Sequence, residues 1–350
     1  MNDNNSLSRR SFVKISAASA AALSVPIAVS CAAEEDKGGK ARAAASVEPD
    51  PMVEASRIAG DPDTYTREYF DSLLLETSYI DSVIPSTKLE LWGHTFDTPI
   101  MTAALSHLGN TAPDGMMTYA KAAAACNAVH WVGMGDDKEL EEIISTGAKS
   151  IKILKPYENN DDVLHKIEHA CKAGCIAVGI DTDHSFNGHG GYDNVLGFQM
   201  KAKTSAEIAQ FVKAAGNVPF IIKGVLSVSD AEKCLNAGVA GIVVSHHHGM
   251  MRYTVPPLMV IEDILKVVGG KMKVFVDCGI ISGMDAYKCL ALGADAVSVG
   301  RHLMPLLKDG PDAVADRIRQ MTDELSGVMS RTGIPSLDKM NPKIVHKRNF

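Results

Sequence analysis

The feature that most constrains the fold is an eightfold alternation of short apolar runs with amphipathic stretches, which starts near Thr98. The apolar runs are apolar at successive positions rather than at every second one, which is typical of strands buried on both faces of a parallel sheet. Several of the amphipathic stretches end in the glycine expected just after a helix. The strand-like runs lie at residues 99–103, 129–132, 150–154, 175–181, 219–224, 241–245, 273–278 and 295–300.

Eight repeats of a strand followed by a helix predict a TIM (β/α)8 barrel, in which parallel strands close on themselves inside a ring of helices. The alternative is an open doubly wound sheet, which more usually has fewer strands and an early GxGxxG turn. The sequence has no such turn. We therefore predict an α/β fold of the barrel type over residues 56–350.

The first 33 residues have the pattern of an export signal rather than of a folded domain. Arg9 and Arg10 are followed by Phe12, Lys14 and an alanine-rich stretch that is too short for a comfortable membrane span. This order resembles a twin-arginine signal, which moves proteins that have already folded, commonly with a cofactor inserted. We predict a signal peptide at residues 1–33 and a location in the cell envelope after export.

Cys31 ends the sequence AVSC, which resembles the processing box of a lipoprotein although Ala28 stands where leucine is usual. Lipid attachment to Cys31 and simple cleavage nearby are both open at this stage. Residues 34–55 contain few bulky apolar side chains, so we expect them to form a flexible tether.

The charge and the cysteines narrow the range of partners. The formal net charge is −7 and the sequence has no basic run, which argues against nucleic acid and against an anionic membrane surface as main partners. A lipid on Cys31 would then be the membrane contact. The seven cysteines include no CxxC pair, and we expect them to pack in the interior rather than to bind metal.

Charged and polar side chains stand where the predicted strands end, and in a TIM barrel this rim carries the chemistry. Asp181 ends the fourth run and Lys223 lies in the fifth, while His246–His248 follow the sixth. Asp277 ends the seventh run and Arg301 follows the eighth. The rim is therefore predicted to combine an acid, a base, a histidine cluster and an arginine.

The seventh and eighth strands form the usual phosphate site of this fold. Gly279 and Gly283 can bring backbone N–H groups close to an anion just before a helix begins. Gly300 adds another open backbone position, and the guanidinium of Arg301 can bind phosphate oxygens in a bidentate manner. This pattern favours a phosphate ligand over ordinary tight turns.

Two long blocks resemble the FMN-dependent 2-hydroxy acid dehydrogenases and oxidases, the lactate and glycolate oxidase group. They are IIKGVLSVSDAEKCLNAGVAGIVVSHHHG and VFVDCGIISGMDAYKCLALGADAVSVGRHL, and the resemblance covers about residues 95–305. It implies FMN as cofactor, a small-molecule substrate and a homo-oligomer such as a tetramer. The electron acceptor could be oxygen, a quinone or a redox protein.

The resemblance also implies roles for individual residues. His247 falls on the catalytic base, Asp181 on the carboxylate that stabilises its imidazolium, and Lys223 on the charge beside the flavin N1 and C2 carbonyl edge. A base of this kind must titrate near neutral pH, which suits histidine. The predicted cofactor contacts are Ala103, Lys223, Ser245, Asp277, Gly279, Gly283, Gly300 and Arg301.

The chain departs from this family at the substrate. The two arginines that hold the substrate carboxylate have no counterpart, since Met250 stands at one position and Gly190 at or near the other. We consider Arg252, Lys155 and His248 as replacement substrate contacts. A larger and less polar substrate is the other interpretation.

Two other functions remain open on the sequence alone. A Schiff-base lyase of the class I aldolase type would use Lys223 as nucleophile and the last two strands to hold a substrate phosphate. A metal-binding envelope protein would use His246, His247 and His248, although consecutive residues at a strand end rarely converge on one ion.

Overall fold

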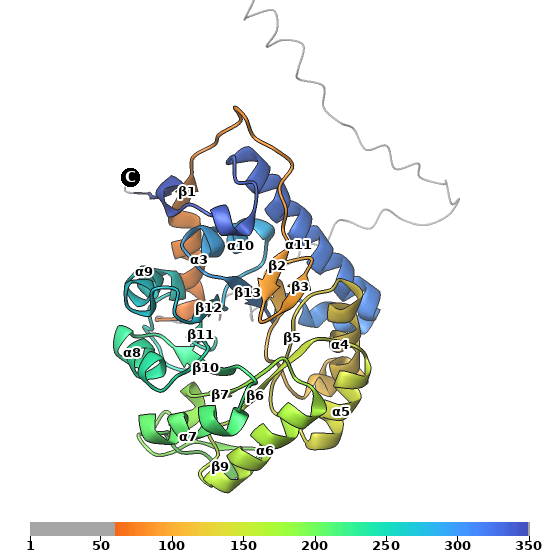
Figure 1. Cartoon of the computed structure of the whole chain (residues 1–350), viewed down its shortest axis with the longest axis vertical. Helices are drawn as coiled ribbons and strands as arrows, with labels where there is room; N and C mark the ends of the chain where they lie inside the picture. The colour runs from red at the N-terminus through yellow and green to blue at the C-terminus, as the bar shows by residue number, and fades with distance from the viewer. Residues whose placement is uncertain (1–59, 349–350) are drawn as a thin grey trace, which may run out of the picture. The chain divides into compact units, whose positions relative to one another are not determined.

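Eight parallel strands form the centre of the molecule in a computed structural model that describes residues 60–348 (Figure 1). Their order is β4-β13-β12-β11-β10-β7-β6-β5. The edge strands β4 and β5 also meet, because the Thr102 N–H donates to the Val129 carbonyl at 3.1 Å and Leu105 bridges Val132. The predicted TIM barrel is confirmed. The strands are β4 Ile100–Thr102, β5 His130–Val132, β6 Ser150–Leu154, β7 Ala177–Asp181, β10 Phe220–Val225, β11 Gly241–Val244, β12 Lys273–Val276 and β13 Ala296–Val299.

Each strand is followed by one helix, and the helices surround the strands (Figure 1). Helix α6 shows how the sequence sets such an element. The Asn159 side chain accepts the Asp161 N–H at its start, and Gly174 ends it with a φ of 94°. Its buried residues follow the helical period and face the sheet. The helices are α4 Gly115–Ala125, α5 Asp137–Ser145, α6 Asn160–Ala173, α7 Ser205–Ala215, α8 Val228–Asn236, α9 Pro257–Val268, α10 Gly283–Ala291 and α11 Pro311–Arg331.

The amino end of the barrel is closed by the hairpin of β2 (Leu89–Leu91) and β3 (His94–Phe96). Side chains of this hairpin are buried with Trp131 and Phe275 from inside the barrel. The Phe275 ring meets the Trp131 ring edge-on, with 5.5 Å between centroids, and Trp92 of the hairpin turn at 5.9 Å. The amino end is therefore a packed apolar core, and the carboxyl end is left for a site.

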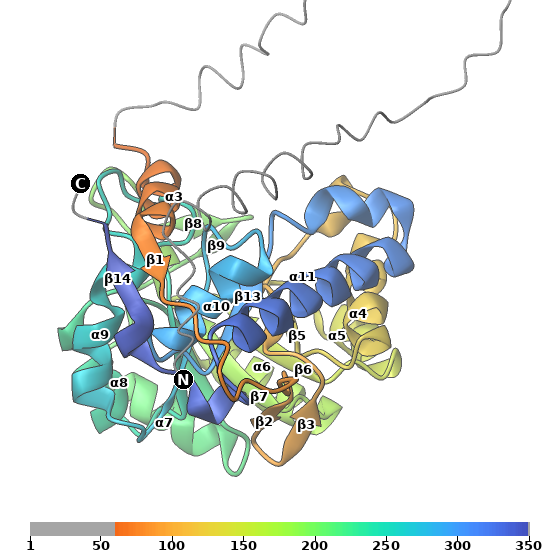
Figure 2. The same cartoon turned by 90° about the horizontal axis from the view of Figure 1, so that it is seen from above.

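The first and last described segments lie together outside the barrel. Helix α3 (Pro62–Ser72) leads into β1 (Leu73–Leu75), which pairs antiparallel with β14 (Val345–Lys347), as Figure 2 shows. The Arg67 guanidinium of α3 binds the Asp285 carboxylate of α10 at 2.9 Å. This ion pair fixes α3 against the end of the barrel where the strands terminate.

Short elements complete the fold. They are the 3-10 helices η1 Leu108–Asn110, η2 Asp183–Ser185, η3 Met304–Asp309, η4 Leu337–Lys339 and η5 Pro342–Ile344, and the paired strands β8 Asn194–Val195 and β9 Phe198–Gln199.

Within residues 60–348 no helix is both long enough and apolar enough to cross a membrane. The six cysteines of this range are free, and five of them are buried, as expected for side chains that pack in the interior. The predicted signal peptide, Cys31 and the tether lie outside the described residues.

Candidate active site

Lys223 is buried at the carboxyl end of β10, where the strand register places it beside Asp181 of β7. Its Nζ lies 3.7 Å from Asp183 Oδ2 and 3.7 Å from Asp277 Oδ2. Burial lowers the pKa of Lys223, but the charges of Asp181, Asp183 and Asp277 outweigh it and raise the pKa above its ordinary value. Lys223 is therefore a permanently charged ammonium.

His247 follows β11 and lies at the mouth of the barrel with a left-handed φ of 45°. Its Nδ1 lies 2.7 Å from Asp183 Oδ1 and 3.4 Å from Asp181 Oδ2. Burial and Lys223 lower the pKa of His247, but hydrogen bonding to Asp181 and Asp183 outweighs both and raises it to about 9. The structure thus brings His247 to both carboxylates, and the shorter contact is to Asp183.

Lys155 follows β6 and donates to Asp181 Oδ2 at 2.7 Å. Burial raises the pKa of Asp181, but Lys223, hydrogen bonding and the charge of Lys155 hold it well below its usual value. Asp181 therefore stays ionised and is directly paired with a lysine. Lys155 is a predicted substrate contact, and its ammonium also has this internal partner.

A second imidazole, which the sequence reasoning missed, lies next to the first. The His184 ring of η2 meets the His247 ring at 84° with 4.8 Å between centroids. Its Nδ1 contacts Asp193 Oδ2 at 3.1 Å. The signal was present in the sequence DTDH, residues 181–184, which places two carboxylates and an imidazole directly at a strand end.

The three consecutive histidines point to three different partners. His246 Nε2 lies 2.8 Å from the Thr66 hydroxyl of α3, and His247 binds Asp183. His248 Nδ1 contacts the Arg301 guanidinium and lies 3.4 Å from Asp63 Oδ1. Their imidazoles therefore do not converge on one ion, and the geometry does not form the three-histidine metal site.

A different group of potential metal ligands occurs at the rim. Atoms of Asp181, Asp183, His184 and His247 lie within 4.8 Å of one another. The ammonium groups of Lys155 and Lys223 already lie among these carboxylates, at 2.7 Å and 3.7 Å. A divalent cation would meet both at close range, so this network balances charge with lysines instead.

Two cavities open at the carboxyl end of the barrel. The β12–β13 cavity holds about 350 Å³ and the β6–β7 cavity about 270 Å³. The first is lined by residues that include Ala103, His248, Asp277, Ser298, Gly300 and Arg301. The second is lined by residues that include Leu105, Ile153, Lys155, Asp181, His184 and His247. Ala103 and His248 line the β12–β13 cavity, and their chain neighbours Ala104 and His247 line the β6–β7 cavity. The two cavities therefore adjoin.

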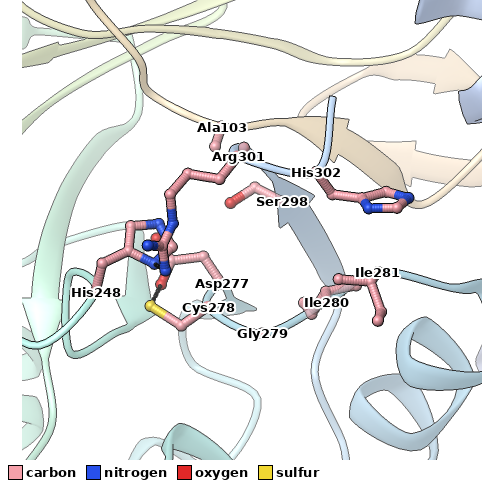
Figure 3. Close-up of a pocket in the computed structure, with 11 residues that line it drawn as sticks. Ala103, His248, Asp277, Cys278, Gly279, Ile280, Ile281, Ser298, Arg301 and His302 are labelled. Carbon is pink, nitrogen blue, oxygen red and sulfur yellow. Dashed lines mark hydrogen bonds between the residues drawn. The ribbon is translucent and has the colours of Figure 1, made fainter. Parts of the chain in front are cut away.

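Arg301 dominates the β12–β13 cavity. Figure 3 shows its side chain extending to His248, close to Asp277 and Cys278. Its guanidinium also binds the Asp63 carboxylate in the first turn of α3. Burial raises the pKa of Asp63, but hydrogen bonding to His248 and Arg301 outweighs it, so the pKa lies below its usual value. An anion in this cavity would compete with Asp63 for Arg301.

The residues of the β12–β13 cavity fit the phosphate and ribityl parts of FMN. A Cβ added at Gly300 would lie 3.1 Å from the Cβ of Ala103, which is closer than an ordinary contact, so glycine avoids crowding at this wall of the cavity. Gly279 has a φ of 70°, and its added Cβ would lie 2.6 Å from Thr66 Cγ2. The turn after β12 therefore keeps a bare backbone beside Arg301, as a phosphate site requires.

Several residues predicted to contact the cofactor or the substrate have other positions or other partners in the structure. Gly283 packs against α11, because its added Cβ would lie 2.2 Å from the Met321 carbonyl oxygen and its N–H donates to Glu324. His248 lies in the β12–β13 cavity rather than with His247. Arg252 is exposed and lines neither cavity. The Ser245 hydroxyl accepts the His247 N–H at 3.1 Å, so it holds the histidine loop.

Fold and site together define a flavin-dependent oxidoreductase of the α/β-barrel class. The profile of the FMN-dependent dehydrogenase family matches residues 56–214 and 192–347, and the chain belongs to this family. FMN is thereby its cofactor, as predicted, and the signal at the N-terminus is not tested by this match.

Relatives and solved structures agree with this assignment. A peroxisomal (S)-2-hydroxyacid oxidase of Arabidopsis thaliana is 29% identical over 311 residues, covering 79% of this chain and 84% of that protein. An L-lactate oxidase of Roseobacter sp. (strain GAI101) is 27% identical over 294 residues, covering 74% and 79%. A crystal structure of mandelate oxidase superposes with a TM-score of 0.74 at 25% identity, covering 83% of this chain and 91% of the other.

Proposed function

We propose that this protein oxidises the hydroxyl-bearing carbon of a 2-hydroxy acid or a related alcohol, with His247 as the base and FMN as the electron acceptor. The observation that carries the proposal is the joint placement of a carboxylate-bound imidazole and the charged Lys223 beside the two adjoining cavities. When bound, FMN takes up the electron pair that leaves the substrate carbon.

His247 has the geometry for its part. Its Nδ1 faces Asp183, which leaves Nε2 to accept the proton of the substrate. The carboxylates stabilise the imidazolium that forms. Lys223, which stays charged, provides a positive charge close to Asp277 at the β12–β13 cavity, where it would stabilise negative charge on a reduced cofactor.

The substrate we favour is a 2-hydroxy acid with an apolar substituent. Leu105, Met134, Ile153 and Leu196 line the β6–β7 cavity, and such walls suit an apolar group on the carbon that is oxidised. Lys155 lines the same cavity and is our candidate partner for the substrate carboxylate. A lysine offers a point charge rather than the bidentate fork of arginine, so substrate binding rests on one ammonium.

The lyase alternative has weaker support. A Schiff-base lysine needs a lowered pKa to be nucleophilic at neutral pH, whereas three carboxylates raise the pKa of Lys223.

The remaining parts of the proposal rest on sequence and on relatives. The relatives compared above are named as oxidases, which supports oxygen as the acceptor over a quinone or a redox protein. The arginine pair Arg9 and Arg10 supports export by the twin-arginine route, and AVSC supports a lipid on Cys31. The resemblance to the family supports a homo-oligomer.

The test uses the purified protein. We expect a flavin absorption spectrum, release of FMN on denaturation, and loss of the oxidised-flavin band when 2-hydroxy acids with apolar side chains are added without oxygen. The control is His247→Gln, which should bind FMN but bleach far more slowly. A protein that holds no flavin and takes up no added FMN would overturn the proposal. Trapping of Lys223 by borohydride with a carbonyl substrate would favour the lyase.

A further inference from the structure

We propose that Asp183 is the carboxylate that positions His247 for proton transfer, and that Asp181 instead anchors the Lys155 ammonium. The inference rests on the proposed function, since it assigns parts to the same site. It moves the direct support of the base to a residue for which the sequence predicted no role.

Distances separate the two carboxylates. His247 Nδ1 lies 2.7 Å from Asp183 Oδ1, a short hydrogen bond, whereas Asp181 Oδ2 is 3.4 Å away. The same Asp181 oxygen accepts from Lys155 at 2.7 Å. One carboxylate oxygen therefore serves the lysine at short range, and the imidazole takes its close partner from the other residue.

The tautomer of His247 follows from its neighbours. Lys223 Nζ lies 3.2 Å from the same Nδ1, and its raised pKa keeps it protonated, so it has a proton to donate there. If Lys223 donated to Nδ1, the proton of a neutral imidazole would sit on Nε2 and block the base. The shorter contact to the Asp183 oxygen places the proton on Nδ1 and leaves Nε2 free. Asp183 therefore sets the tautomer that catalysis needs.

The fold makes room for Asp183. Gly224 of β10 has a φ of 92°, and an added Cβ would lie 2.7 Å from Asp183 Oδ2. The pairing of β10 with β11 shifts register between Lys223 and Val225, at this glycine. The Thr182 N–H and hydroxyl both bind the Lys223 carbonyl, at 2.9 Å and 3.0 Å. These contacts hold the loop after β7 so that the Asp183 carboxylate reaches His247.

The carboxylates of Asp181 and Asp183 share one buried site, and this explains why the two residues have different roles. Burial raises the pKa of Asp183 and the charge of Asp181 adds to this, which together outweigh Lys223. The oxygens Asp181 Oδ1 and Asp183 Oδ2 are both buried without a hydrogen-bond donor. Despite burial, Lys223, hydrogen bonds and Lys155 keep the pKa of Asp181 low, so Asp181 stays charged, whereas burial and the charge of Asp181 raise the pKa of Asp183. The charged and titratable groups facing His247 are Lys155, Asp181, Asp183, His184 and Lys223.

The test compares Asp183→Asn with Asp181→Asn in the FMN-loaded protein, with the exposed Asp312→Asn of α11 as the matched control outside the site. We expect Asp183→Asn to lower kcat strongly with little change in KM. It should also move the acid limb of kcat/KM to lower pH, by about one to three pH units, because the imidazolium loses its carboxylate. Asp181→Asn should mainly raise KM, because Lys155 loses its anchor. Asp312→Asn should leave kcat, KM and the position of the limb unchanged.

A second measurement does not depend on turnover or on an aspartate variant. Nitrogen-15 NMR of labelled histidines in the wild-type protein, with His247→Gln to assign the signal, should report a proton on Nδ1 when the pH is above the His247 pKa of about 9 and the ring is neutral. A proton on Nε2 would overturn the proposal, and so would a larger kcat loss in Asp181→Asn than in Asp183→Asn. A protein that oxidises no hydroxy acid but shows the Nδ1 proton would contradict the proposed function alone.

Discussion

The two ends of the barrel are built from the same inward-facing columns of side chains and yet have opposite chemistry. In β10 the apolar Ile221 is followed two positions later by Lys223, and Phe275 of β12 is followed two positions later by Asp277. A spacing of two keeps side chains on one face of a strand. The barrel interior thus changes from apolar packing to buried charge between one inward-facing residue of a strand and the next. Stability is concentrated at the amino end, and the charges at the other end are held by one another.

The largest effect on activity should come from a substitution at the charged carboxyl end of the barrel. His247→Gln removes the proposed base, and loss of a general base slows the chemical step by about 10²- to 10⁴-fold. The variant should fold and bind FMN like the wild type. Anaerobic stopped-flow reduction of the bound flavin measures the loss, with the exposed His165→Gln as control. A variant with wild-type reduction rates would show that another group takes the proton.

The apolar end should respond in stability instead. Phe275→Ala removes a buried ring between Trp92 and Trp131, which costs about 3–5 kcal/mol of unfolding free energy. Denaturant unfolding measures this cost, and Phe198→Ala on the exposed β9 is the control. The rate of flavin reduction per folded molecule should stay close to that of the wild type. A large drop in that rate would mean that the two ends are not separate.

The pH dependence of kcat/KM should be set by the charged carboxyl end of the barrel alone. The pKa of His247 is raised to about 9, and the base must be neutral to accept a proton. Below that pKa the neutral fraction falls about tenfold per pH unit, so kcat/KM should rise from neutral pH towards 9. Steady-state rates in buffers across this range provide the measurement. A profile that is flat over the same range contradicts the pairing with carboxylates.

The smallest effect concerns cofactor affinity. Asp63→Asn removes the carboxylate that binds Arg301, so the guanidinium should become more available to a phosphate. Such half-exposed ion pairs contribute up to about 1 kcal/mol, which corresponds to a gain of at most about fivefold in FMN affinity. Titration of the FMN-free protein with FMN tests it, with Asp312→Asn of α11 as control. Weaker binding would mean that Asp63 supports Arg301 rather than competing with the phosphate.

The sequence was sufficient to predict the barrel because the pattern that indicates it, an apolar run followed by an amphipathic stretch, repeats along the chain. Continuous apolar runs mark parallel strands, and the strand ends then locate Asp181, Lys223 and Asp277 on one rim. The partners at the rim could not be derived in this way. His247 and His248 have left-handed φ values of 45° and 54°, and these send consecutive side chains into different cavities. A sequence pattern does not report such loop angles, so the preference of His247 for Asp183 was missed.

Contacts between residues far apart in the chain were the other feature that the sequence did not predict. Nothing local in the sequence connects Asp63 with Arg301 or Thr66 with His246, because α3 reaches the rim only through tertiary packing. The neighbour of Gly283 is likewise the distant α11, which no local pattern indicates.

The contacts of α3 also determine when the site can be completed during synthesis. Thr66 meets a residue 180 positions later in the chain, and Asp63 one that is 238 positions later. These are among the first described residues to leave the ribosome, whereas Arg301, the partner of Asp63, is made late. The β12–β13 cavity is therefore completed only after Arg301 has been made, so we expect FMN to be bound in its final form by a nearly complete chain and not by an early growing one.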